Sequence, residues 1–388
     1  MLINFSYILP EPKNIVIFNP SIVYWKDNLY LICYRRFFRS LDYYNHSLID
    51  PYHNSNHPWY GGPDSKTWWK SGKGEDDTGL LLIEIIGYNI KIVKNFSNDI
   101  GYIKGADARL LKLNSEKNSF VITYNVWLNN RPDLMLKNDR CNKWCGLIAM
   151  KKIELNPNDY SIKMSNESIV CPNISNQVEK NWSFWDLQNK LYFSYNLSPR
   201  HMVVSLKNSN SCSFNSIIGD NKNFFERFEQ YYQQNSGHQV TFICLSTPSI
   251  PLPNSNRYIG VGHIKYKIDT IPFIPKDSNL YKFHTNLIKK PINFHPVYVY
   301  MMFFYEFDPY TYEFTRVSDF FFPHIDEWGL VFPSGLTSTH NENTLLVSYG
   351  DHDSECKLFT ISIQKLNSML YNINYIEPNV LNFLILDN

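Results

Sequence analysis

A hairpin pattern that recurs five times constrains the fold of this 388-residue chain more than any other feature. Each copy opens with polar residues, runs into a short apolar stretch, reverses at an Asn-containing turn and returns as a second apolar stretch with polar residues at its end. The return stretches end at Tyr34, Tyr124, Tyr195, Gly262 and Tyr349, so successive ends lie 90, 71, 67 and 87 residues apart by subtraction. Recurrence in fixed order at this scale is typical of repeat architectures.

A second hairpin candidate follows in the intervals, so each repeat contains four predicted strands. The candidates are Leu80–Ile86 with Ile90–Phe96, Leu147–Leu155 with Tyr160–Val170, a weaker one around Met202–Ile218, Tyr298–Phe307 with Tyr312–Val317, and Leu358–Ile363 with Leu370–Ile376. This pattern predicts an all-β fold, a five-bladed β-propeller with four-stranded antiparallel blades, which leaves only short sheet edges. Two or three β-sandwiches would also show regular short strands. The propeller is favoured because the polar residues keep the same place in every repeat.

A closed propeller is one domain, so we expect residues 1–388 to form a single domain without a linker. Residues 1–18 are expected to donate the strand that closes the ring on the last blade. Residues 37–78 form a long insertion rich in aromatic residues. Long loops without secondary structure are usually functional or disordered. The aromatic content favours a lid over a pocket, with disorder as the alternative.

Composition and charge exclude several classes of function. The formal net charge is +1, which argues against a nucleic-acid surface that depends on bulk charge. No stretch of 18 consecutive apolar residues predicts a membrane helix, and the first residues lack the pattern of a signal peptide, so a cytoplasmic location is expected. The seven cysteines have no regular spacing, and we predict no metal site.

The polar ends of the hairpins predict a shared pocket. The first strand of an antiparallel hairpin starts at the end where the second finishes, so in a propeller these ends meet at one mouth of the central channel. Cations outnumber carboxylates there, and Arg presents a bidentate fork to phosphate. Asp107 would be ionised among these cations unless burial or a bound phosphate raises its pKa. An acid beside a phosphate site suggests glycosyl transfer to or from phosphate. The plainer alternative is a strand-end ion pair between Asp107 and Arg109.

Short motifs in all five repeats carry a family resemblance. They are Asn19-Pro20-Ser21 with Tyr34-Arg35, Asp107-Ala108-Arg109, Lys180-Asn181-Trp182, Thr247-Pro248 with His263, and Ser334-Gly335-Leu336 with Tyr349-Gly350-Asp351-His352-Asp353. In this order they resemble the five-bladed propeller glycosidases and phosphorylases that act on β-mannosides (glycoside hydrolase family 130-like) and related propeller modules of the glycosyltransferase type. The chain departs from that pattern at Ala106 and Ala108, where the family has an acidic residue and a proline around its catalytic Asp.

The resemblance implies a role for each matched residue. Asp107 would be the general acid, acting through a sugar hydroxyl. The phosphate or anion ligands would be Arg35, Arg109, Lys180 and His263. The sugar would be held by Asn19, Asn125, Trp182 and Asp353.

The expected function is therefore that of a glycoside phosphorylase, which transfers a mannose-like sugar between a glycoside and phosphate. Its partners would be an oligosaccharide or sugar phosphate, with inorganic phosphate as co-substrate and no other cofactor, and a homo-oligomer stays open. Three alternatives remain. A hydrolase would need Asp351 or Asp353 as a second carboxylate, a glycosyltransferase would use an activated sugar donor, and a non-catalytic propeller would only bind sugar.

Overall fold

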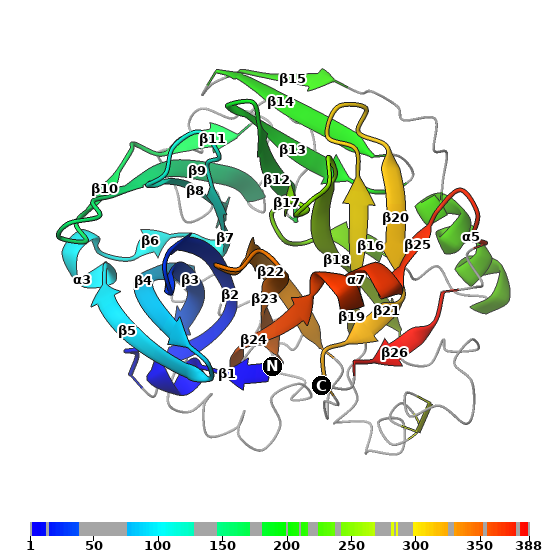
Figure 1. Cartoon of the computed structure of the whole chain (residues 1–388), viewed down its shortest axis with the longest axis horizontal. Coiled ribbons are helices and arrows are strands. Elements are labelled where there is room, and N and C mark those ends of the chain that lie inside the picture. Colours follow the sequence, from blue (N-terminus) through cyan, green and yellow to red (C-terminus); the bar gives the residue numbers. More distant parts are fainter. Residues whose placement is uncertain are drawn as a thin grey trace.

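The described residues form mostly strands, which build five sheets, and at least four of these sheets are arranged as blades of a β-propeller (Figure 1). The predicted all-β class is thereby confirmed. Within the described residues, no helix is long and apolar enough to cross a membrane. The computed structural model describes residues 2–12, 15–38, 76–127, 146–170, 181–198, 201–208, 211–215, 224–236, 242–267, 281–282, 285, 298–324, 330–351, 355–377 and 381–386.

The first two repeats form antiparallel sheets in chain order, as the paired hairpins predicted. Their turns are tight because a residue such as Asp27, at φ 50°, adopts the left-handed conformation that Asn and Asp tolerate. The first sheet consists of β2 (Ile15–Lys26), β3 (Leu29–Phe38), β4 (Asp76–Ile86) and β5 (Asn89–Asn95), with β6 (Ile103–Lys104) beside β4. The second consists of β7 (Ala106–Lys112), β8 (Ser119–Trp127), β9 (Gly146–Leu155) and β10 (Ile162–Met164), with β11 (Ser168–Val170) beside β9.

The predicted insertion at 37–78 was placed wrongly at both ends. Residues 37–38 continue β3 and residues 76–78 begin β4, and the two strands pair from Phe37↔Asp76 onward. The hairpin is therefore longer than the apolar run suggested, because backbone pairing continues through charged residues. Residues 39–75, and with them the predicted lid, lie outside the described residues.

The third repeat is regular, whereas the fourth carries additional strands. The third sheet consists of β12 (Ser183–Leu187), β13 (Lys190–Asn196), β14 (Met202–Asn208) and β15 (Ser211–Asn215). Helix α5 (Phe224–Ser236) follows it. In the fourth sheet the inner strand is split into β16 (Phe242–Leu245) and β17 (Ile250–Pro251), and both pieces pair with β18 (Tyr258–Lys267). The sheet continues with β19 (Tyr298–Phe307), β20 (Phe314–Ser318) and β21 (Phe320–Phe322).

The two ends of the chain complete different sheets. The fifth sheet consists of β22 (Val331–Ser338), β23 (Thr344–Asp351), β24 (Glu355–Ser362) and β1 (Leu2–Asn4). The N-terminal residues therefore close this sheet, as predicted.

The predicted hairpin between Leu358–Ile363 and Leu370–Ile376 is wrong. Helix α7 (Ile363–Met369) follows β24, with its first turn capped by the Ser362 hydroxyl, and it buries Leu366 and Met369. Strand β25 (Leu370–Asn372) then pairs with β20 in the fourth sheet, and β26 (Phe383–Ile385) runs parallel to β21. The helix carries the chain from one sheet to its neighbour.

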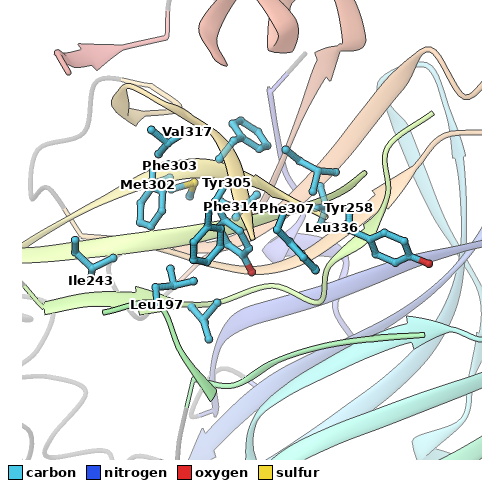
Figure 2. Close-up of a cluster of buried hydrophobic side chains, with 14 of the residues drawn as sticks. Leu197, Ile243, Tyr258, Met302, Phe303, Tyr305, Phe307, Phe314, Val317 and Leu336 are labelled. Carbon is cyan, nitrogen blue, oxygen red and sulfur yellow. The ribbon is translucent and has the colours of Figure 1, made fainter. Parts of the chain in front are cut away.

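The core is densest where the fourth sheet packs against its neighbours. Strand β19 is buried along nearly its whole length, because sheets cover both of its faces. The rings of Tyr305, Phe307 and Phe314 lie together in this cluster, with Leu336 of the fifth repeat close by (Figure 2). Ring centroids of Tyr305 and Phe314 are 5.8 Å apart, edge to face. Each such side chain contributes roughly 1.5–3 kcal/mol by burial.

Candidate functional site

A β-bulge at the start of the inner strand repeats in the first two repeats. Asn19 and Pro20 of β2 lie opposite the single residue Tyr34 of β3, and the pairing of β7 with β8 is interrupted at the corresponding place, where Asp107 lies. Both Asn19 (φ 48°) and Asp107 (φ 50°) have left-handed backbone conformations. Such bulges re-aim side chains next to functional sites. Here they bring two residues 88 positions apart into contact.

The carboxylate of Asp107 accepts two hydrogen bonds from the first repeat. The amide of Asn19 donates to Oδ1 over 2.8 Å, and Arg35 Nη1 donates to the same oxygen over 2.9 Å. The Asp107 side chain keeps 18% of its surface exposed, so it faces an opening. Burial acts to raise the pKa of Asp107, but the charge of Arg35 and the hydrogen bonds outweigh it and lower the pKa below its usual value. Asp107 is therefore ionised at neutral pH in this arrangement.

Arg109 of the second repeat contacts residues of the third, fourth and fifth repeats. Its Nε donates to the carbonyl oxygen of Ser246, Nη1 donates to the carbonyl oxygen of Asp107 over 3.0 Å, and Nη2 donates to Asn181 Oδ1 over 3.4 Å. The guanidinium also lies 5.7 Å from the ring centroid of Phe332 in the fifth repeat. Arg109 is only 3% exposed. It does not pair with the Asp107 carboxylate in a strand-end ion pair; Arg35 does.

His263 is linked to Arg109 through a residue that contacts both, Ser246. Its Nδ1 is 2.6 Å from the hydroxyl of Ser246, the residue whose carbonyl holds Arg109. The imidazole stacks on the ring of Tyr300 with centroids 5.4 Å apart, and it is buried. Ser246 therefore links two of the predicted anion ligands. No sequence motif assigns a role to Ser246, because nothing in a single serine signals a backbone carbonyl contact.

Asn125 and Trp182, predicted to hold the sugar, are both buried. Asn125 pairs with Ala106 at the start of β7 and is 2% exposed. Trp182 is 3% exposed and packs edge to face on Phe193 and Tyr195, with centroids 5.9 and 5.0 Å away. Much of the Trp182 surface is therefore used by the core. The sugar-binding roles of both residues stay predictions.

Asp351, the candidate second carboxylate, lies at the end of β23 and is fully buried. Its Oδ2 accepts a hydrogen bond from Lys357 and lies 3.2 Å from His324 Nε2. Two further predicted ligands, Lys180 and Asp353, lie outside the described residues.

Gly350 is required by the approach of the first repeat to the fifth. A Cβ atom at this position would lie 2.1 Å from Asn19 Oδ1 and 2.8 Å from the Asn19 nitrogen. Any other residue here would displace Asn19, the hydrogen-bond partner of Asp107. Within the described residues, no group of three or more His, Cys, Asp and Glu side chains could hold a metal ion.

Comparison with solved structures finds distant similarity over most of the chain. A mannose phosphorylase from Leishmania mexicana in complex with phosphate has 13% identity and a TM-score of 0.47, with 93% of this chain and 87% of that chain covered. A GDP-Man-dependent mannosyltransferase from the same organism has 11% identity and a TM-score of 0.49, with 98% and 94% covered. A beta-1,2-mannobiose phosphorylase from Listeria innocua has 11% identity and a TM-score of 0.45, with 95% and 98% covered. No protein-family model and no curated protein matches the sequence.

Proposed function

We propose that the chain is a carbohydrate-active enzyme of the glycoside phosphorylase type, with a five-bladed propeller as its scaffold and Asp107 as its acid–base residue. The five sheets support the blade count. One observation carries the assignment: the partly exposed Asp107 carboxylate is held by Arg35 and Asn19, while Arg109 lies two residues further along the same strand. A carboxyl group and two guanidinium groups in one cluster would supply an acid and an anion site.

The charges of this cluster favour an anionic co-substrate. Arg35 and Arg109 carry two positive charges and Asp107 one negative charge, which leaves one positive charge in a largely buried setting. Phosphate would compensate this positive charge, because guanidinium groups bind phosphate oxygens with charge-assisted hydrogen bonds. The added negative charge next to Asp107 raises the pKa of that carboxyl group. Phosphate binding would therefore convert Asp107 toward the acid form that phosphorolysis needs.

The proposed reaction balances without a further reactant. An oxygen of hydrogen phosphate attacks the anomeric carbon while the glycosidic C–O bond breaks. Asp107 supplies the proton that the departing sugar oxygen takes up, and the proton lost by hydrogen phosphate restores the Asp107 acid. The products are a sugar 1-phosphate and a sugar with a free hydroxyl group. A mannose-like sugar is the proposed substrate, following the motif resemblance.

The ionised state of Asp107 favours a second candidate, the reaction in the direction of synthesis. A carboxylate can accept the proton of an acceptor hydroxyl while that oxygen attacks the anomeric carbon of an activated donor. The leaving group would be phosphate for a reversed phosphorylase, or a nucleoside diphosphate for a glycosyltransferase. Arg35 and Arg109 would bind either anion. The site thus supports both reactions, which differ in the sugar donor that they use.

A hydrolase is less well supported by the same residues. Its second carboxylate would have to activate water, and Asp351 is fully buried and hydrogen-bonded to Lys357. The Asp351 carboxylate is thus already used in an ion pair with Lys357.

Product analysis tests the proposal. The purified chain is incubated with β-linked mannobioses and phosphate, or with mannose 1-phosphate or GDP-mannose and acceptor sugars, and phosphorus NMR follows the products. We expect mannose 1-phosphate to form from mannobiose only when phosphate is present, and phosphate to be released from mannose 1-phosphate when an acceptor is added. Turnover of GDP-mannose alone would assign a glycosyltransferase. Release of free mannose independent of phosphate would assign a hydrolase, and saturable binding without any turnover would assign a sugar-binding protein.

A further inference from the structure

A cavity lies at the opposite end of the inner strands from Asp107. It has a volume of about 490 Å³ and is lined by the turn ends of inner hairpins from all five repeats. One lining residue from each is Tyr24, Asn114, Asp186, Pro251 and His340. The volume falls within the range of small-molecule sites. Nothing in the proposed reaction uses this cavity.

The distance along β7 separates the two sites. Lys112, in the cavity wall, follows Asp107 by five residues on the same strand. A strand rises about 3.3 Å per residue, so the Cα atoms of the two residues lie up to about 16 Å apart. A sugar held by Asp107 and Arg35 would not reach this wall. The cavity is therefore a separate site, which we call the turn-end cavity.

Lys112 presents a cation to the turn-end cavity. Its Nζ donates to the carbonyl oxygen of Trp25 over 2.7 Å and lies 5.3 Å from the ring centroid of Tyr24. Within the described part of the chain, the Trp25 carbonyl is its one hydrogen-bond acceptor. An ammonium group has three N–H donors. Two donors of Lys112 therefore remain for a ligand.

Asp186 and Asn114 form a fixed pair in the wall of the turn-end cavity. Asp186 Oδ2 accepts the backbone N–H of Asn114 over 2.8 Å, and the Asn114 amide donates to the Asp186 carbonyl oxygen over 3.0 Å. Asp186 is 2% exposed, and burial raises the pKa of its carboxyl group. No cation pairs with this carboxylate among the described residues. A hydroxyl donor from a ligand would satisfy its remaining lone pairs.

The charged residues that line the turn-end cavity indicate which class of ligand it can bind. Lys112 and Lys117 are balanced by Asp186 and Glu342. A strongly anionic ligand would meet two carboxylates, and a cation would meet two ammonium groups. An apolar ligand would leave the buried carboxylate and amide without partners, which is costly. A neutral molecule with many hydroxyl groups can donate to Asp186 and accept from Lys112 at the same time.

We propose that the turn-end cavity binds a neutral saccharide of mono- or disaccharide size, at a site separate from Asp107. The inner hairpins would then hold sugar at both ends of the central channel. Such a site lets the chain remain attached to a glycan while the Asp107 opening stays free. The proposal does not depend on catalysis at Asp107.

Hydrogen exchange followed by mass spectrometry locates the site. The full chain is exposed to about 20 mM mannobiose, cellobiose or maltose, and calorimetry measures the affinity in parallel. We expect a Kd of about 1 mM with at least one of the three sugars. Exchange should slow in the turns 112–117 and 337–342, and this protection should persist in the Arg35→Met variant.

Variants of the cavity wall complete the test. Lys112→Met and Asp186→Asn should each weaken saccharide binding about tenfold, because each removes a charge-assisted hydrogen bond. His340→Ala changes an exposed turn residue, so the variant should fold normally. If the buried variants are unstable, loss of exchange protection in the turn 337–342 of His340→Ala tests the cavity instead. The proposal is overturned if none of the sugars protects the two turns in the wild type, or if Arg35→Met removes that protection.

Discussion

Asn19 and Asp107 occupy the same position in two successive repeats, and the amide of the first donates a hydrogen bond to the carboxylate of the second over 2.8 Å. Both residues have left-handed backbone conformations, at φ 48° and 50°. Among residues with a side chain, Asn and Asp adopt this conformation most readily. The same left-handed backbone conformation thus positions an amide in one repeat and a carboxylate in the next.

The backbone of Asn19 can be tested apart from its hydrogen bond. Asn19→Ala and Asn19→Gly both remove the amide, but only Gly adopts positive φ without steric cost. We expect the Gly variant to be more stable than the Ala variant by about 1 kcal/mol. Urea unfolding of the two variants measures this difference. Equal stabilities would mean that the bulge relaxes when the amide is lost.

Replacement of Asp107 tests its role as acid and base. Asp107→Asn keeps an acceptor for Arg35 but can neither hold nor release the reacting proton. We expect turnover of mannose 1-phosphate to fall about 10²–10⁴-fold while ligand binding persists. A matched control is Asp308→Asn, because Asp308 also pairs with an arginine, Arg257, at a distant turn. Undiminished turnover in Asp107→Asn would remove Asp107 from the mechanism.

The sequence predicts most of the hairpins and the placement of Arg35 and Asp107 at the same end of their sheets, because both follow from strand periodicity and antiparallel pairing. It does not reveal contacts made by backbone atoms. The Ser246 carbonyl holds Arg109, and any residue at that position has a carbonyl. Strand β25 was assigned to the wrong sheet because three residues carry too little pattern to specify an edge.

His201 makes stability depend on pH. It is buried between Ser194 Oγ at 2.8 Å and the Tyr312 carbonyl at 2.7 Å, and burial lowers its pKa to about 4. An unfolded histidine titrates near 6.5, so below that pH the unfolded state binds more protons. The stabilisation is complete above pH 6.5 and is lost as the pH falls toward 4. The depression corresponds to about 3 kcal/mol in the free energy of unfolding.

The His201 contribution can be isolated by denaturant unfolding between pH 7 and 4. His201→Gln should be less stable than the wild type at pH 7, and its stability should fall less on acidification. His340→Gln, in an exposed turn, should lose stability on acidification as steeply as the wild type. A slope in His201→Gln as steep as that of the wild type would show that other groups cause the loss.

Ser246 connects the two anion ligands through different atoms, so one substitution separates them. Ser246→Ala keeps the carbonyl that holds Arg109 but removes the hydroxyl 2.6 Å from His263 Nδ1. The imidazole then loses the hydroxyl partner of its Nδ1, which helps to set its tautomer and orientation. We expect the KM for phosphate to rise about tenfold with a smaller change in kcat, because the substitution mainly weakens phosphate binding.

A matched control for this prediction is Ser249→Ala, in the same segment between β16 and β17. It removes an equally buried hydroxyl that bonds with Ser183 and Tyr305 instead of His263. Each variant should lose about 1 kcal/mol of stability, since each loses a buried hydrogen bond. Only Ser246→Ala should change the KM for phosphate, because only its hydroxyl contacts a group in the anion site. Equal changes in KM for both variants would assign Ser246 a purely structural role and remove His263 from the phosphate site.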